Sequence, residues 1–375
     1  MPVEGLIYLY LAVCAGLIGF NLTAAARAKH RERRIARKAD RMERRILRQL
    51  PLLEAAGLVE EGFLRGMERR LRRVESMLAL DAALERLQAR QPEQVWALLR
   101  AMDGVTVALA KDYCRRRDDV EAAFFPYIIR KYRLLQGRRD RTLEGLLLEL
   151  LRQPSIYCRE SAMQAIYTAG DPALVVQALK IIDSERRFYH GRLISNGLLN
   201  DQSDRQALDQ ALWAVFDELG PELQLALLNY FRYSSGDHAE KMLALLQDPE
   251  RDDELRFSCL RYLGHYPYAP AYETLLELAE PDRERRWEYA AVAAAALAAY
   301  PGEETLRVLR RDLCHANWYV RDNAARSMER LDCPWRELEE VMASGDRFAA
   351  EMLRYRLEER ELEPEREEDA ACMMA

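Results

Sequence analysis

The chain has 375 residues with a net charge of −6, about half of them apolar and nearly a third charged, and only 17 glycines and 14 prolines. This composition, together with the lack of alternating β-branched runs, is typical of an all-α protein and argues against a β-sheet domain. The seven cysteines are scattered and include no CxxC motif, which argues against a disulfide framework or a zinc knuckle.

The first predicted element is the uncharged stretch at residues 5–26, GLIYLYLAVCAGLIGFNLTAAA. As an α-helix it would span about 33 Å, which matches the hydrocarbon thickness of a bilayer. A cleaved signal peptide and a buried internal helix are the alternatives, but residues 1–4 contain no Lys or Arg. Because positive charge follows the apolar run, we predict one transmembrane helix within residues 1–26. The N-terminus is expected outside the cell membrane and the rest of the chain in the cytoplasm.

A basic block follows at residues 27–50, with eleven basic and three acidic side chains. Its apolar residues recur at helical spacing. Two interpretations are open, of which we favour an ordinary stop-transfer flank over a helix that lies along anionic lipid headgroups. The apolar residues in question are Ile35, Met42, Ile46 and Leu50.

Residues 51–138 are predicted to be helical, but they fit the repeat described below poorly. Candidate helices lie near residues 58–73, 74–89, 92–102 and 104–135, the last with an interruption near Pro126. A solenoid needs an atypical end unit that seals its core. We expect this segment to supply such a cap.

From residue 139 to about residue 360 the chain repeats with a period of about 33 residues. Asp171, Asp204 and Asp237 recur at this period, and because Asp is a good N-cap each is expected to begin a first helix. A second column reads Arg159, Arg192, Gln224, Arg256, Glu288 and Arg321. Small or apolar residues follow three positions later at Ala162, Ser195, Leu227, Cys259, Ala291 and Ala324, and apolar ones seven positions later at Ile166, Leu199, Phe231, Leu263, Ala295 and Met328. These columns predict a stack of helix pairs with the second helices packed through them.

The segment ANWYVRDNAARSMERLD at residues 316–332 contains Val-Arg followed by Ala-Ala, and PSIYCRESAMQAIYTAGD at 154–171 has nearly the same pattern. With these motifs the sequence resembles the HEAT-repeat family over residues 139–360, although Gln224 and Glu288 depart from the recurring Arg. The resemblance implies an α–α superhelix, an armadillo-like solenoid, preceded here by the transmembrane helix. Repeats of this kind serve many roles, and they also occur in phycobilin-lyase-like and alkylpurine-glycosylase proteins, so the resemblance alone leaves an enzyme open.

Motifs that carry catalysis or hold metals are missing from the sequence. It contains no HExxH, GxSxG, P-loop or GxGxxG motif. The helix expected between Cys314-His315 and Cys333 would hold them about 22 Å apart. We therefore predict no catalytic residue, no metal and no cofactor. The acidic tail at residues 361–375 is predicted to be disordered.

Partner binding is expected on aromatic and arginine side chains outside the packed columns, since Tyr, Trp and Arg dominate binding hot spots. The recurring arginines have a structural alternative, which we favour: ion pairs with carboxylates of neighbouring repeats. The candidate partner-binding residues are Tyr189, Arg192, Tyr266, Trp287, Tyr319 and Arg321.

Together these features predict a non-catalytic, membrane-anchored cytoplasmic scaffold that binds a protein partner, such as a membrane enzyme or synthase, through its repeat surface. One alternative is a repeat-based enzyme, glycosylase-like or lyase-like, and another is an extracytoplasmic repeat protein. Nucleic acid is not expected as a partner, because the chain outside the basic block is acidic.

Overall fold

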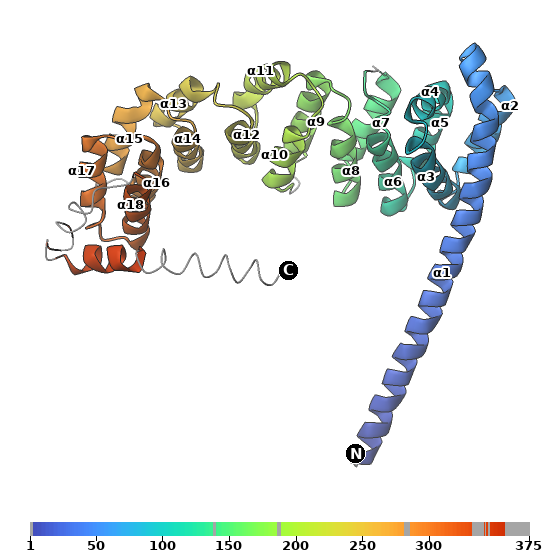
Figure 1. The fold of residues 1–375 in the computed structure, drawn as a ribbon, viewed down its shortest axis with the longest axis horizontal. Helices are drawn as coiled ribbons and strands as arrows, with labels where there is room; N and C mark the ends of the chain where they lie inside the picture. The colour runs from blue at the N-terminus through green and yellow to red at the C-terminus, as the bar shows by residue number, and fades with distance from the viewer. Residues whose placement is uncertain are drawn as a thin grey trace. The chain divides into compact units, whose positions relative to one another are not determined.

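The computed structural model describes residues 3–137, 140–185, 189–280, 286–331, 341, 343 and 346–356. The described part is built from helices and contains no strand, so the prediction of an all-α protein is confirmed (Figure 1). The predicted acidic tail at residues 361–375 lies outside the described residues, as do Cys333 and Cys372.

The chain divides into two compact units, residues 1–187 with 201–204, and residues 188–200 with 205–375. Unit 1 contains α1 (Val3–Ala56), α2 (Glu61–Leu71), α3 (Val74–Gln88), α4 (Pro92–Ala101), α5 (Asp103–Tyr113), α6 (Asp119–Lys131), α7 (Arg141–Leu151), α8 (Ile156–Ile166) and α9 (Pro172–Ser184). Unit 2 contains α10 (Gly191–Leu199), α11 (Arg205–Val215), η1 (Phe216–Glu218), α12 (Pro221–Ser234), α13 (Ala239–Gln247), α14 (Asp253–His265), η2 (Ala269–Ala271), α15 (Tyr272–Ala279), α16 (Trp287–Ala296), η3 (Leu297–Ala299), α17 (Glu303–Asp312) and α18 (Trp318–Arg330).

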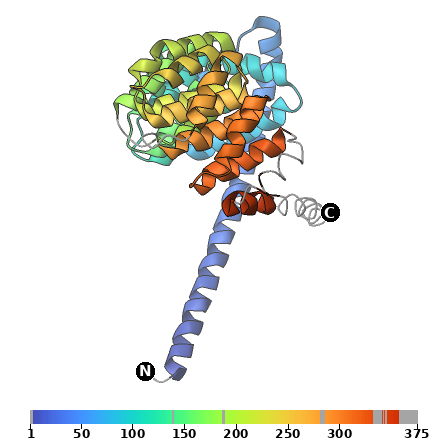
Figure 2. The same cartoon turned by 90° about the vertical axis from the view of Figure 1, so that its left-hand side faces the viewer.

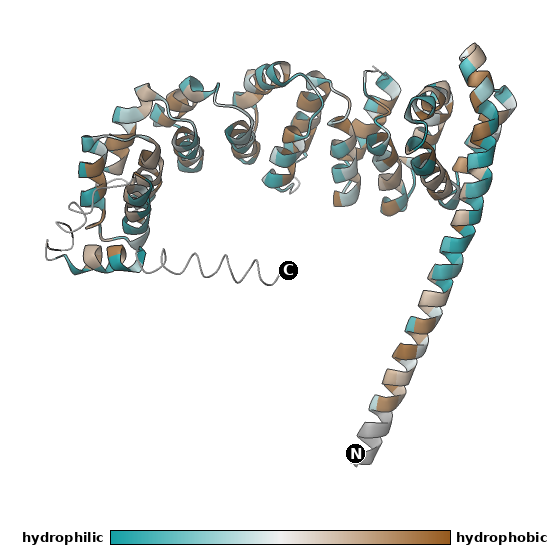
Figure 3. Ribbon diagram, in the orientation of Figure 1, coloured by the Kyte–Doolittle hydropathy of each residue, from teal (hydrophilic) through white to brown (hydrophobic). Residues whose placement is uncertain are grey.

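Helix α1 is one continuous helix with two different environments. Its N-terminal part is apolar and extends free of the other helices of unit 1 (Figures 2 and 3). Among the described residues it is the one helix long and apolar enough to cross a membrane. Its C-terminal part packs on α3 and α4 and buries five apolar side chains. These are Ala39, Met42, Ile46, Leu50 and Leu53.

The burial of these apolar side chains argues against the interpretation of residues 27–50 as a helix that lies along lipid headgroups over its whole length. Met42, Ile46 and Leu50 face protein, so they are not free to lie on lipid. Part of the basic charge is also paired, because Lys38 Nζ lies 2.7 Å from a Glu75 oxygen and Arg34 contacts the same carboxylate. The unburied basic region is therefore shorter than predicted, and the helix runs without a break past residue 50 to Ala56.

The predicted helices of residues 51–138 correspond to α2 to α6, with one correction. The interruption lies between α5 and α6 at residues 114–118, and Pro126 is inside α6. Asp118 begins α6 by accepting a hydrogen bond from the backbone N–H of Glu121 at 3.0 Å. This arrangement of Asp followed three residues later by Glu is a helix-start signal in the sequence. The pair α5–α6 also continues the packing order of the later pairs, since α6 packs on α8 as α5 does on α7.

The second helices pack directly on one another within each unit. In unit 2, α10 packs on α12, α12 on α14, α14 on α16 and α16 on α18. The column of small or apolar residues three positions after the Arg column is buried throughout, as predicted. The column seven positions after it is buried at Ile166, Phe231, Leu263 and Met328, whereas Leu199 and Ala295 are partly exposed.

The first helices follow the predicted positions less regularly. Asp171 caps α9 by accepting from the N–H of Ala173 at 2.9 Å, as predicted. In α13, however, the N-cap is His238, one residue after the expected Asp237. The backbone N–H of Asp237 donates to the Ser235 hydroxyl at 3.0 Å, which holds Asp237 in the preceding turn. The helix therefore starts one residue late.

Candidate functional site

At four of its six positions, the recurring Arg column donates to backbone carbonyls at the end of the preceding helix or in the loop that follows it, whereas Glu288 accepts a bond from Arg286 instead. Arg321 Nη1 donates to the carbonyl oxygens of His315 and Ala316 at 2.7 and 2.9 Å, and Gln224 Nε2 donates to that of Phe216 at 2.9 Å. Backbone carbonyls that turn away from regular helical bonding need donors from elsewhere, and these side chains supply such donors between the two helices of a pair. The equivalent bonds elsewhere are Arg159 to Gln153 and Pro154, and Arg256 to Leu246.

This geometry explains why the column recurs and why Gln can replace Arg in it. The role needs an N–H donor of sufficient reach, and it is structural, as favoured from the sequence. The partner differs from the prediction, since at Arg159, Arg256 and Arg321 it includes a backbone carbonyl of the same helix pair. Arg321 is buried by this contact, whereas Arg192 is exposed.

The structure brings two of the candidate residues together on unit 2. The rings of Trp287 and Tyr319 are stacked with centroids 5.6 Å apart and an interplanar angle of 14°. Trp318 meets Tyr319 edge-on at 5.3 Å. The three residues remain 39%, 46% and 59% exposed for Trp287, Trp318 and Tyr319 respectively. We call these three side chains the aromatic surface.

The positions of these rings follow from the helix starts. Trp287 and Trp318 are the first residues of α16 and α18, and Tyr319 is the second residue of α18. The side chain of Asn317 caps α18 by accepting from the N–H of Tyr319 at 2.8 Å. Because successive second helices start side by side, aromatic residues at their first turns come into contact across the pair.

Helices α16 and α18 form a close-packed support beneath the aromatic surface. The side chain of Asn323 donates to the carbonyl oxygen of Ala291 at 2.8 Å, and that of Ser327 to Ala294 at 2.7 Å. On the other side of α16, a Cβ atom added at Gly264 of α14 would lie 2.8 Å from the Cα of Ala296. The support is therefore built from small residues that allow backbones to approach, which fixes the rings above it.

Charged residues flank the aromatic surface and join α14 to α16. Arg286 donates from Nη1 to Asp253 Oδ2 and from Nη2 to Glu288 Oε1, both at 2.9 Å. The Tyr289 hydroxyl donates to Asp253 Oδ1 at 2.6 Å. The hydrogen bond from Tyr289 and the charge of Arg286 hold the pKa of Asp253 below its usual range. The aromatic surface is thus bordered by charges of both signs.

Two other candidate partner-binding residues, Tyr189 and Tyr266, are not part of the aromatic surface. Tyr189 is buried, and the ring of Tyr266 is half-buried against Tyr262 and His265, with centroid distances of 5.1 and 4.6 Å. Trp318 was not singled out from the sequence. Its signal was its position directly after an Asn cap, where a side chain on the first turn has no preceding turn to cover it.

A buried polar network connects α11, α12 and α13 in unit 2. His238 Nε2 lies 3.1 Å from Asp209 Oδ2, and the Tyr230 hydroxyl donates to Asp209 Oδ1 at 2.6 Å. Trp213 Nε1 donates to His238 Nδ1 at 3.2 Å. Because an indole only donates, Nδ1 must be the acceptor and Nε2 carries the proton toward Asp209. Both ring nitrogens are thus occupied, so the network holds helices together and leaves the imidazole no nitrogen with which to act as a base.

No group of three or more His, Cys, Asp and Glu side chains that could hold a metal ion occurs in the described part of the chain. The comparisons with known proteins add no assignment: no protein-family model matches the sequence, and no curated protein matches it.

Proposed function

We propose that this protein is a membrane-anchored scaffold whose helix pairs form a HEAT-like solenoid in the cytoplasm and bind a protein partner through the aromatic surface. The observation that carries the proposal is the exposed stack of Trp287 on Tyr319, with Trp318 beside it. Exposed aromatic groups held by a rigid support cost little conformational entropy on binding and commonly supply the hot spots of interfaces.

The solenoid is supported by the recurring packing of second helix on second helix within each unit. A repeat architecture of this kind presents side chains of successive first turns along one edge. Trp287 and Tyr319 occupy such neighbouring first turns. The HEAT resemblance of residues 316–332 belongs to the same helix that carries Tyr319.

The membrane anchor is supported by the apolar N-terminal part of α1, which no other described residue covers. Basic residues between Arg27 and Arg37 follow it and favour a cytoplasmic location for the remainder. The exposed side chains of this stretch are also suited to anionic lipid headgroups. Since α1 continues into the core of unit 1, the anchor and unit 1 would move as one body.

The test is a detergent pull-down with the variant Trp287→Ala combined with Tyr319→Ala. The two rings are partly exposed and stack mainly on each other, so the double variant should keep its helical content by circular dichroism. Recovery of the partner should fall by at least about tenfold, because each anchor of this kind contributes about 2 kcal/mol or more.

The matched control replaces Tyr157 and Tyr233 by Ala, two aromatic residues of 67% and 59% exposure that lie off the aromatic surface. This variant should retain the partner. Full recovery with the Trp287 and Tyr319 variant would place the binding surface elsewhere and remove the basis of the proposal.

A further inference from the structure

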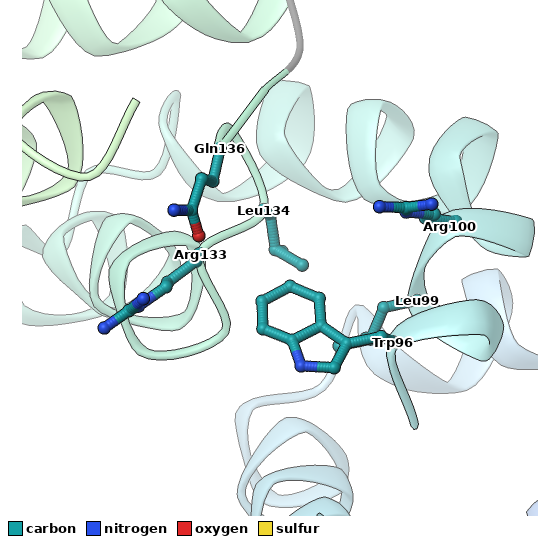
Figure 4. Close-up of a pocket in the computed structure, with 6 residues that line it drawn as sticks. All are labelled: Trp96, Leu99, Arg100, Arg133, Leu134 and Gln136. Atoms are coloured by element: carbon teal, nitrogen blue, oxygen red, sulfur yellow. The ribbon is translucent and has the colours of Figure 1, made fainter. Parts of the chain in front are cut away.

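Unit 1 contains a cavity of about 210 Å³ between α4 and the segment that follows α6 (Figure 4). Its apolar wall is formed by Trp96, Leu99 and Leu134. Its polar wall is formed by Arg100, Arg133 and Gln136, and no carboxylate is among the described residues that line it. The indole of Trp96 lies at the centre of the group in Figure 4, with Leu99 and Leu134 beside it.

The two arginines of this cavity have no internal anion. Across the described residues, neither Arg100 nor Arg133 forms an ion pair or a side-chain hydrogen bond, unlike Arg86 or Arg116 in the same unit. Both side chains are exposed. Figure 4 shows them on opposite sides of Trp96, with the Arg133 guanidinium turned away from the indole. The proposal below requires the guanidinium of Arg133 to turn toward the cavity by rotation about its side-chain bonds.

The backbone conformation of Arg133 is a second, independent observation about this residue. Arg133 is the one described residue other than glycine with a positive φ, at 46°. It directly follows the C-cap of α6, where the N–H of Arg133 donates to the Arg130 carbonyl and the N–H of Leu134 to that of Ile129. Glycine is the usual residue at this point of a helix end, because a Cβ atom is strained there. An arginine at this point keeps a guanidinium beside the cavity at a cost in stability.

With α1 spanning the membrane as proposed above, the cavity lies far along that helix from the lipid headgroups. The side-chain amide of Gln94 contacts Glu54 of α1, which places the start of α4 level with the C-terminal end of that helix. The distance along α1 from Ala26 to Glu54 is about 40 Å at the usual helical rise. On this point the inference rests on the proposed membrane position of α1, from which a ligand of this cavity comes from the aqueous phase.

We propose that this cavity binds a carboxylate carried on a single ring or a similarly compact apolar group, with the ring against Trp96 and the carboxylate between Arg100 and Arg133. Guanidinium groups suit carboxylates through paired N–H donors. The volume lies below the range of about 300–1,000 Å³ that is usual for larger ligands, so only a compact group fits. The source is either a free small acid or the C-terminal residue of a polypeptide. The proposal does not depend on the aromatic surface of unit 2.

The test uses the full chain in detergent micelles and 4-fluorophenylacetate as the probe, with binding followed by the broadening of its ¹⁹F resonance. Wild type should broaden the signal of the acid but not that of 4-fluorophenylacetamide. Arg100→Gln combined with Arg133→Gln should weaken binding by about tenfold or more, since a hydrogen bond to a charged group is worth about that factor. Arg69→Gln combined with Arg117→Gln removes the same charge from exposed positions of unit 1 outside the cavity, and it should bind like wild type.

A second variant separates binding from folding. Arg133→Gly relieves the strained backbone, so its melting temperature should rise by about 2–4 °C while its affinity for the acid falls. N-acetylglycyl-4-fluorophenylalanine distinguishes the sources: binding of this peptide indicates a polypeptide C-terminus, and binding of the small acid alone indicates a free acid. Equal binding of acid and amide, or undiminished binding by Arg133→Gly and by the double Gln variant, would overturn the proposal.

Discussion

The substitution Asp312→Asn is predicted to stabilise unit 2 at neutral pH. Asp312 is the last residue of α17 and is fully buried. Among the residues that the structure describes, neither of its carboxylate oxygens has a hydrogen-bond partner. The Nε of Arg311 lies 4.0 Å from Oδ1, while Nη1 of the same arginine donates to Glu280. Burial therefore raises the pKa of Asp312 to about 8 from its ordinary value of 3.8.

The sign and size of the effect follow from proton linkage. Between pH 3.8 and 8 the folded chain keeps a proton that the unfolded chain releases, so this residue lowers the free energy of unfolding increasingly as pH rises. The loss amounts to about 2 kcal/mol at pH 5 and about 4 kcal/mol at pH 7. Asparagine does not titrate, so the stability of Asp312→Asn relative to wild type should increase by about 2 kcal/mol between these two pH values.

The assay is urea unfolding of the detergent-solubilised full chain, followed by circular dichroism at pH 5 and pH 7. Comparison at two pH values cancels any pH-independent cost of burying the amide. Glu304→Gln on the same helix is the control, because Glu304 is exposed and its bond with Arg307 lies at the surface. Such pairs contribute at most about 1 kcal/mol. A pH-independent difference between Asp312→Asn and wild type would refute the reasoning, since it would mean that the carboxylate ionises normally.

Three further predictions test the repeat packing and the anchor. Arg321→Met should lower the free energy of unfolding by about 2 kcal/mol through lost bonds to the carbonyls of His315 and Ala316 in the loop before α18, and Arg321→Gln by less, because Gln224 fills a similar role in its own pair. Ala324→Leu should overpack the α16–α18 contact and cost about 1–3 kcal/mol, whereas Arg307→Leu should cost less than about 0.5 kcal/mol; equal melting temperatures would contradict the packing described. A reporter fused after Ala375 should be active only in the cytoplasm, with the protein retained in the membrane after a carbonate wash, and activity on the opposite side would reverse the proposed orientation.

The second helices were predictable because their buried positions recur at a nearly constant step. A residue such as Ala162 or Ala324 is small in each case for the same reason, namely that a neighbouring second helix packs there. The contact between Trp287 and Tyr319 follows from the same step, since these residues are about one repeat apart. The aromatic surface could thus be predicted in part, although Trp318 was missed.

Three other features were not predictable from the sequence, each for a different physical reason. The stripe containing Met42 and Ile46 has the spacing of a helix on a membrane surface and equally of a helix on a protein core, and only the packing of α3 decides between them. The late start of α13 depends on the hydrogen bond between Ser235 and Asp237, a local competition that no periodicity records. The cavity beside Trp96 joins residues of α4 with Arg133, whose backbone conformation has no sequence signal because glycine is the residue expected there.

Site-specific photo-crosslinking in intact cells tests the proposed scaffold most directly. A photoreactive amino acid in place of Tyr319 reports on the aromatic surface, and the same group in place of Arg307 reports on an exposed position of α17. We expect one dominant protein to be crosslinked from position 319 and not from position 307, and the product to disappear when Trp287 is replaced by Ala. Identical products from both positions, or a product at 319 that is indifferent to Trp287, would contradict the assignment of the aromatic surface as the binding site.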